Sequence, residues 1–187
     1  QERIFFAYTK SKKNCCDLFR KYYGDSIGAT SALVHGLKSL GKEMRGFHTK
    51  PIPRMYQFLS KYEEISENFE SKNFDLVIIP DTSDPWQTGY DKTQSHIFEK
   101  DTDHIPVINI DHHASNTFFG TLNIVHTEVE SACGIVYELM KVWGIPVSSE
   151  VATGILTGIY NDTGGFMHNV SARILKISAE LVKNGGD

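Results

Sequence analysis

The feature that most constrains the fold is a series of short apolar runs separated by segments long enough to form helices. Four such runs lie at residues 4–7, 44–47, 76–79 and 107–110, each bounded by polar or turn residues. Short runs of this kind are typical of strands that are buried on both faces. Strands that alternate with helices form an open parallel sheet covered on both sides. We therefore predict a doubly wound α/β domain, with a mainly parallel sheet of about five strands and helices on both faces.

Helical periodicity and capping residues support this prediction. Apolar residues recur at helical spacing in four segments, at residues 27–40, 131–142, 151–159 and 172–182. Gly41 suits the C-terminal cap of the first segment, and Ser171 suits the N-terminal cap of the last. The length of 187 residues fits one domain with a full core.

Composition narrows the class of protein. The net charge of −4 argues against a broad cationic surface for duplex nucleic acid, but it allows a small phosphorylated ligand. No apolar run approaches the length needed to cross a membrane, and the first residues do not resemble a signal peptide. The three cysteines form no disulfide framework, so we expect a reducing, cytoplasmic environment.

Polar side chains follow two of the predicted strands. Asp111, His112 and His113 come directly after the last apolar run, and Asp81 follows the run before it with one proline between. In open α/β sheets, ligands bind at the carboxyl ends of the strands. Carboxylate and imidazole groups together suit Mn²⁺, Zn²⁺ or Fe²⁺. The pattern predicts a divalent-cation site, and the alternative for Asp81 is a cap on the turn that follows it.

Two further carboxylates have both a capping and a metal-binding interpretation. Asp162 closes an apolar helix, where the helix macrodipole disfavours a negative charge unless a cation compensates it. Asp25 stands at the start of the first predicted helix, where an N-terminal cap is its simplest role. Asp84, which is followed by Pro85, is the expected cap of its own helix.

Trp86 and Tyr90 lie near the predicted site and also have two interpretations. Aromatic rings at such a place can stack on a base of a single-stranded substrate. Packing beneath a loop is the simpler interpretation for both residues.

These motifs resemble those of the DHH phosphoesterases. Asp-His-His at 111–113 is the motif that gives this family its name, and residues 81–84 are similar to its second motif. Residues 130–139 resemble its serine-containing segment and the helix that follows. Residues 158–166 resemble its fourth motif, Gly-Ile-x-x-Asp-Thr-Gly-x-Phe. With its four motifs in the family's order, the chain resembles the nano-RNase and pAp-phosphatase branch, and RecJ-type exonucleases more distantly.

The resemblance implies a metal-dependent hydrolase of phosphate esters in short oligoribonucleotides or in nucleotides such as pAp. It implies two divalent cations, usually Mn²⁺, with Mg²⁺ or another divalent cation as the alternative. Asp81 would bridge them, and Asp25, His112 and Asp162 would complete the ligand set of one cation. His113 would contact the substrate phosphate. By the same resemblance, the Asp111 carboxylate would orient the histidines.

The resemblance also implies an arrangement of domains and partners. Residues 1–187 would form the DHH domain, and a C-terminal substrate-binding domain of the DHHA1 type would lie outside this sequence. A nucleotide or a short single-stranded oligonucleotide would bind between the two domains. A homodimer is implied by the resemblance alone.

The family's first motif, His-x-x-Pro-Asp-x-Asp, is only partly present. Phe19 and Tyr23 occupy the places of its histidine and first aspartate, and Asp25 matches its last aspartate. The segment at 10–21 is also longer than the usual connection. Three interpretations stay open: the domain has lost one metal site and is catalytically impaired, residues 15–17 supply substitute ligands, or the stretch differs from that of the working enzyme. An inorganic pyrophosphatase, which shares the metal arrangement, is a further alternative.

Overall fold

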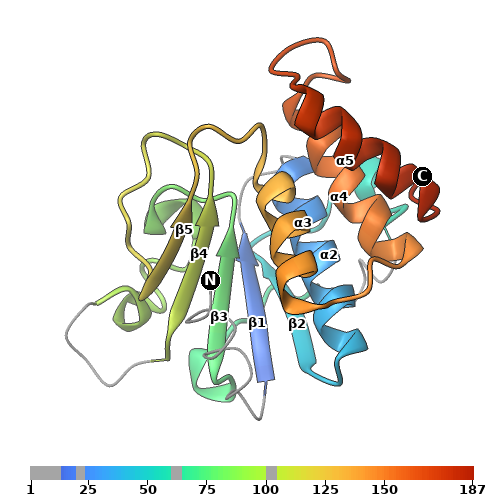
Figure 1. Ribbon diagram of the computed structural model, residues 1–187. Coiled ribbons are helices and arrows are strands. Elements are labelled where there is room, and N and C mark those ends of the chain that lie inside the picture. Colours follow the sequence, from blue (N-terminus) through green and yellow to red (C-terminus); the bar gives the residue numbers. More distant parts are fainter. Residues whose placement is uncertain (1–13, 20–23, 60–64, 100–104) are drawn as a thin grey trace.

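The protein folds around a single parallel sheet. The computed structural model describes residues 14–19, 24–59, 65–99 and 105–187, with only the backbone described for 14–19. The sheet consists of β1 Asn14–Phe19, β2 Glu43–His48, β3 Leu76–Pro80, β4 Val107–Asp111 and β5 Leu122–Val125. These five parallel strands lie in the order β2-β1-β3-β4-β5 (Figure 1). The predicted α/β fold with a parallel sheet of about five strands is confirmed.

The first strand of the sheet differs from the prediction. The predicted run at 4–7 lies outside the described residues, whereas β1 occupies a segment that we expected to be a connection. β1 pairs with both β2 and β3, so it is an interior strand. Asn14 and Asp17 interrupt its apolar pattern, which is why periodicity did not identify it as a strand.

All four predicted helical segments are helices in the structure. They are α2 Gly24–Ser39, α3 Ala132–Trp143, α4 Ser149–Asp162 and α5 Ala172–Lys183. Gly41, just after α2, has a φ of 76°, and the Ser171 hydroxyl accepts a hydrogen bond from the Ile174 N–H at the start of α5. Both capping predictions are therefore confirmed. None of the described helices combines the length and the apolar character needed to cross a bilayer.

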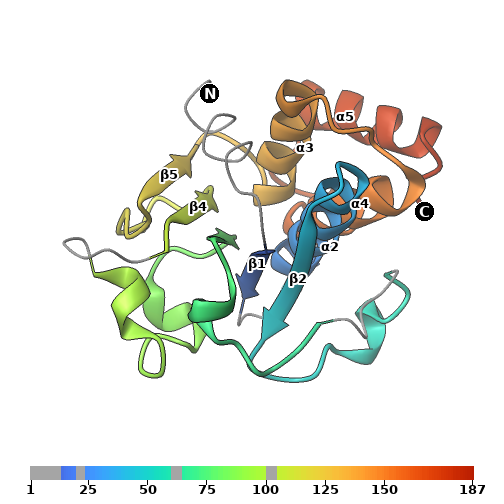
Figure 2. The same ribbon diagram turned by 90° about the horizontal axis from the view of Figure 1, so that it is seen from below.

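The two faces of the sheet are covered differently (Figure 2). α2 and α3 contact the strands on one face, and α4 and α5 pack against these helices. Alternate residues of a strand point to opposite faces, so Ile78 joins the core beneath the helices while Ile79 joins a second apolar cluster. The second cluster is covered by segments that contain the short 3-10 helices η3 Ser71–Asn73, η4 Pro85–Thr88 and η5 Ser95–Phe98. In the described part of the chain, the helices predicted for this face are therefore short 3-10 helices rather than α-helices.

The order of the strands determines where a ligand can bind. The chain moves outward from β1 to β2 and then returns to β3 on the other side of β1. Such a reversal leaves a crevice at the carboxyl ends of the strands, which is where ligands bind in open α/β sheets. Pro80 pairs with Ile110, so the segments that follow β3 and β4 begin side by side at this edge.

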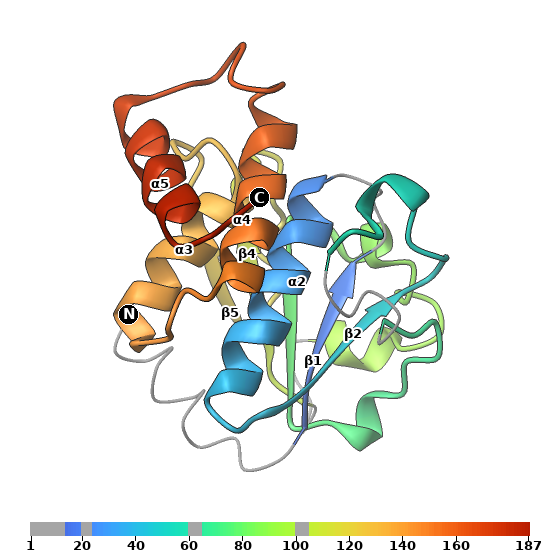
Figure 3. The same ribbon diagram turned by 90° about the vertical axis from the view of Figure 1, so that its right-hand side faces the viewer.

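α2 and α4 pack with their backbones unusually close together (Figure 3). A Cβ atom added to Gly28 would lie 2.3 Å from the carbonyl oxygen of Gly154, and one added to Gly154 would lie 2.8 Å from the carbonyl oxygen of Gly28. Residues with a side chain cannot be accommodated at that separation. The close packing brings Asp25 at the start of α2 near Asp162 at the end of α4.

Candidate metal centre

The four side chains predicted to bind one cation converge at the carboxyl end of the sheet. Asp81 follows β3, His112 follows β4, Asp25 lies in the first turn of α2, and Asp162 ends α4. One potential ligand atom of each residue lies within 4.8 Å of those of the other three. Their role as metal ligands stays a prediction, and this convergence favours it.

Asp81 has a backbone conformation that few residues adopt. Its φ is 49°, in the left-handed region that aspartate and asparagine tolerate better than most residues. Its N–H donates to the Ile110 carbonyl at 2.8 Å, and its side chain is buried. Burial raises the pKa of Asp81 and the charge of Asp162 adds to this effect, although the contact with His112 opposes it. Such conformations are most often found at functional sites, where the surroundings hold them.

Asp81 does not cap the helix that follows it. The helix that follows, η4, is capped by Asp84, whose carboxylate accepts a hydrogen bond from the Trp86 N–H at 3.2 Å. Pro85 occupies the first turn, as predicted. Asp81 is therefore available for contacts with the other members of the cluster.

Asp25 does not cap its own helix either. Helix α2 begins at Gly24, and the Asp25 carboxylate instead accepts hydrogen bonds from the N–H groups of Ala132 at 2.6 Å and Cys133 at 2.9 Å. These groups lie at the N-terminus of α3, where the helix dipole favours a negative charge. Full burial and the charges of Asp81 and Asp162 nevertheless raise the pKa of Asp25 well above its ordinary value. The carboxylate is thus held in place at an electrostatically crowded position.

The ring of His112 is oriented toward the carboxylates. Its Nδ1 lies 3.3 Å from the Val129 carbonyl, which assigns the Nδ1 proton to that contact. Its Nε2 lies 3.1 Å from Asp162, 3.7 Å from Asp81 and 3.9 Å from Asp25. This nitrogen is buried and makes no hydrogen bond of normal geometry with the described residues. A lone pair that faces three carboxylates is stable only with a cation between them or with a proton on the nitrogen, so the four residues fit a divalent cation.

The pKa of His112 leads to a prediction about pH. Burial lowers the pKa of His112, but contacts with Asp162 and Asp81 and the charge of Asp25 outweigh burial and raise it from 6.5 to about 11. Its imidazolium therefore stabilises the cation-free fold fully below pH 6.5, and this stabilisation is lost as the pH rises toward 11. Because a metal ligand must be neutral imidazole, we expect Mn²⁺ affinity to rise about tenfold per pH unit between pH 7 and 9.

Calorimetric titration of Mn²⁺ in buffers of different ionisation enthalpy would measure both the affinity and the protons released. The exposed His126 is the matched control, and His126→Asn should retain the same slope. A pH-independent affinity in the unmodified chain would contradict coordination by His112.

Asp111 is fully buried and uses both carboxylate oxygens in hydrogen bonds. One oxygen accepts from the His112 backbone N–H at 2.9 Å and from the His113 Nδ1 at 2.8 Å, and the other accepts from the Asn116 amide at 2.6 Å. Burial raises the pKa of Asp111, but the hydrogen bonds from His113 and Asn116 outweigh it and the net pKa is lowered. This arrangement favours the predicted role of Asp111, which is to orient the histidines. The His113 side chain is 36% exposed, against 14% for His112, so it is the more accessible of the two rings.

Two buried amides complete the site, and sequence reasoning missed them. Asn109 donates to the carbonyls of Ile79 at 3.1 Å and Thr82 at 2.9 Å, and Asn116 donates to the Asn109 side-chain oxygen at 2.8 Å. Together with the bond from Asn116 to Asp111, these contacts tie the segment that carries Asp81 to the segment after β4. The available signal was Asn109 itself, a polar residue within an apolar run.

Replacement of Asn116 by alanine should weaken this connection. We expect the free energy of unfolding to fall by about 1 to 3 kcal/mol, because buried hydrogen-bonding groups lose their partner. Chemical denaturation in the presence of chelator would measure the change, with the exposed Asn73→Ala as the control. A loss no greater than in Asn73→Ala would mean that the amide network does not hold the two segments together.

The strand register bears on the proposal that residues 15–17 supply substitute ligands. Asp17 pairs with Ile78, three residues before Asp81. At about 3.3 Å per residue, Asp17 lies roughly 10 Å below the level of Asp81 along the strand. The two cysteines of β1 lie lower still, so this register argues against all three residues as replacements for the missing ligands.

The two aromatic residues near the site differ. Tyr90 is buried in the second apolar cluster, and its hydroxyl donates to the Glu67 carbonyl at 3.1 Å. The simpler interpretation, packing beneath a loop, is confirmed for Tyr90. Trp86 lies on η4 and is 57% exposed.

Comparison with known proteins identifies the family. Residues 20–159 match the family model described as the DHH family, N-terminal domain. The chain belongs to the DHH family. The Asp-His-His motif at 111–113, together with Asp25 and Asp81, lies within the matched residues.

Two curated relatives of this DHH domain carry the same name. Over 164 residues it is 34% identical to the bifunctional oligoribonuclease and PAP phosphatase NrnA of Thermus thermophilus, a match that covers 87% of this chain and 47% of the relative. It is 27% identical to the Bacillus subtilis protein of the same name, and that match covers 85% of this chain and 49% of the relative. The chain thus spans about half the length of the curated relatives it matches.

Solved structures show the same fold. An exopolyphosphatase-related protein from Bacteroides fragilis superposes with a TM-score of 0.87 at 25% identity, covering 100% of this chain and 56% of that protein. The exonuclease RecJ bound to manganese superposes with a TM-score of 0.55 at 16% identity, covering 98% of this chain and 46% of RecJ. At that identity the likeness to RecJ concerns the fold alone.

Proposed function

We propose that this DHH domain is the catalytic domain of a divalent-cation-dependent phosphoesterase. Its substrates would be phosphate esters in short oligoribonucleotides or in nucleotides such as pAp, as the names of the two NrnA relatives suggest. The observation that carries the proposal is the convergence of Asp25, Asp81, His112 and Asp162, with potential ligand atoms within 4.8 Å of one another. Mn²⁺ is the proposed ion, because three carboxylates and one imidazole suit it.

Each residue of the cluster has a definite role in this proposal. Asp25, Asp81, His112 and Asp162 would hold the ion, which when bound supplies an activated water and neutralises charge on phosphoryl oxygens. His113 would contact the substrate phosphate, because its ring is 36% exposed while its Nδ1 is fixed by Asp111 at 2.8 Å. A ring fixed on one nitrogen presents the other in a constant direction, which reduces the reorganisation needed to bind a phosphate.

A second candidate function is a nucleotide- or metal-binding domain that has lost hydrolysis. The observation in its favour is the presence of Phe19 and Tyr23 at places where the family's first motif has a histidine and an aspartate. Neither residue can supply a carboxylate or an imidazole, so one of the family's two cations would lack ligands. Inorganic pyrophosphate hydrolysis is a third candidate that uses a similar set of ligands.

Elemental analysis after reconstitution with Mn²⁺, combined with substrate assays, tests these candidates together. The phosphoesterase is supported if the chain binds one or two equivalents of metal and also hydrolyses a substrate. The hydrolysis is seen as release of phosphate from pAp or as cleavage of short oligoribonucleotides. Bound metal without hydrolysis would favour the second candidate, and phosphate release from pyrophosphate alone would favour the third. If no metal binds, the proposed function fails.

A further inference from the structure

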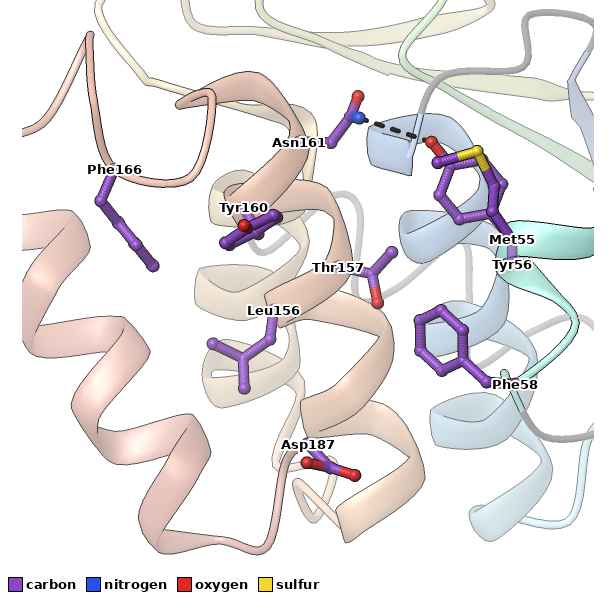
Figure 4. A pocket seen from close by; sticks show the side chains of 9 residues that line it. All are labelled: Met55, Tyr56, Phe58, Leu156, Thr157, Tyr160, Asn161, Phe166 and Asp187. Carbon is purple, nitrogen blue, oxygen red and sulfur yellow. Dashed lines mark hydrogen bonds between the residues drawn. The ribbon is translucent and has the colours of Figure 1, made fainter.

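A groove next to the metal centre has no role in holding the cation. It runs between α4 and the segment that contains the 3-10 helix η1, Arg54–Tyr56 (Figure 4). Its volume is about 410 Å³, within the range of about 300 to 1,000 Å³ that is typical of pockets for small molecules. The groove is therefore large enough for part of a nucleotide.

One end of the groove is joined to the metal centre by hydrogen bonds. The amide of Asn161 donates to the Tyr56 hydroxyl oxygen at 3.4 Å, and its oxygen accepts from the Gly24 N–H at 3.0 Å. Asn161 directly precedes Asp162 in the sequence, and Gly24 directly precedes Asp25. A ligand whose phosphate lies at the metal centre would have to extend past Asn161 and Tyr56 to reach the groove.

The lining of the groove suits a flat, uncharged ring. Tyr160 of α4 is 62% exposed and Phe58 of the η1 segment is 59% exposed, and they lie on either side of Thr157 (Figure 4). Aromatic rings stack on nucleobases with little regard to base identity. Polar groups are few, as in most ligand pockets, and one of them is the amide of Asn161, which also accepts the hydrogen bond from the Gly24 N–H.

The charge of the lining indicates which part of a nucleotide could bind. Among the lining residues that the structure describes, Asp187 is the one with a charged side chain, and that charge is negative. A phosphate in the groove would be repelled by it and would find no cationic partner among these described residues. A neutral base avoids this repulsion and covers apolar surface that would otherwise face water.

We propose that this groove binds a nucleobase of the substrate, next to the phosphate at the metal centre. The inference rests on the proposed function for the position of the phosphate. The stacking contacts come from Tyr160 and Phe58, neither of which belongs to the metal cluster. Both side chains are exposed, so their removal should leave the fold intact.

Saturation-transfer NMR with adenosine tests the groove without any contribution from a metal or a phosphate. We expect the adenine protons to receive saturation from the 187-residue chain in the presence of chelator. In Tyr160→Ala and Phe58→Ala the affinity should be about tenfold weaker or more. Leu175→Ala is the control, because Leu175 is similarly exposed at 49% but lies on α5, outside the groove. It should bind adenosine as the unmodified chain does.

Three outcomes, two from NMR and one from analytical ultracentrifugation of the same variants, would overturn the inference. The first is no transfer to adenosine in the unmodified chain, and the second is transfer that is lost in Leu175→Ala but kept in Tyr160→Ala. The third is a dimer, seen in analytical ultracentrifugation, that dissociates in Tyr160→Ala while adenosine binding is unchanged. In that case the groove is an interface between two copies of the chain.

A second set of titrations separates this inference from the proposed function. Mn²⁺ alone, inorganic phosphate with Mn²⁺, and pAp with Mn²⁺ are each titrated into the unmodified chain and Tyr160→Ala. We expect Tyr160→Ala to weaken pAp binding about tenfold and to leave Mn²⁺ and phosphate binding unchanged. Failure to bind Mn²⁺ would reject the proposed function, whereas equal pAp binding in both proteins would reject the groove.

Discussion

Asp81→Asn is expected to abolish the stabilisation of the fold by Mn²⁺ while changing the stability of the cation-free protein little. Asparagine tolerates the left-handed φ of 49° and keeps the size of the side chain, so the backbone hydrogen bond to Ile110 should persist. The variant loses one of the three carboxylates that face His112. Since changes to residues that merely support a ligand cost about 10- to 100-fold in metal affinity, loss of a ligand should cost more than about 100-fold.

Thermal unfolding with and without Mn²⁺ measures this effect directly. Ligand at 100 times its dissociation constant stabilises a fold by about 2.7 kcal/mol, and this increment should disappear in Asp81→Asn. Asp84→Asn is the control, because Asp84 caps η4 and its asparagine can still accept the hydrogen bond from the Trp86 N–H. If Asp81→Asn kept the full Mn²⁺ increment, Asp81 would not be a ligand.

The helices could be predicted from sequence because their signals are local. Apolar periodicity identified the four α-helices in the described part of the chain, and Ser171, Gly41 and Asp84 cap helices in the structure as their types and positions predicted. β1 could not be predicted in the same way. Its pairing between β2 and β3 is a tertiary effect, and the strand carries polar residues that a local pattern assigns to a connection.

The metal cluster shows the same division between local and long-range information. Its four expected members come from motifs and converge as those motifs implied. The way they are held could not be predicted, since Asp25 is bound by the N–H groups of Ala132 and Cys133, which lie 107 and 108 positions away. Asn116 was missed for a similar reason, because a single asparagine after a motif gives no indication that it will be buried against Asp111.

Gly158→Ala should damage both the fold and the metal centre. A Cβ atom at Gly158 would lie 2.2 Å from the Cys133 sulfur and 2.4 Å from an Asp25 carboxylate oxygen. Neither neighbour can move freely, since Cys133 lies in the first turn of α3 and Asp25 is fixed by two N–H groups. Overpacking of this kind typically costs about 1 to 3 kcal/mol, and we expect a loss near the upper end. Displacement of Asp25 should also weaken Mn²⁺ binding at least about tenfold.

Gly36→Ala is the matched control for this prediction. It is the same substitution within a helix, but the nearest atoms to the new Cβ, at 2.9 Å, belong to the flexible end of Met140. Side-chain adjustment there, together with a gain in helix propensity of about 1 kcal/mol, should leave stability nearly unchanged. Adding Cys133→Ala to Gly158→Ala removes the contact with sulfur, but it leaves the contact with Asp25 and the one at 2.8 Å with the Cβ atom at position 133. Stability should then recover in part while Mn²⁺ affinity stays low, and recovery of both would mean that Gly158 does not set the position of Asp25.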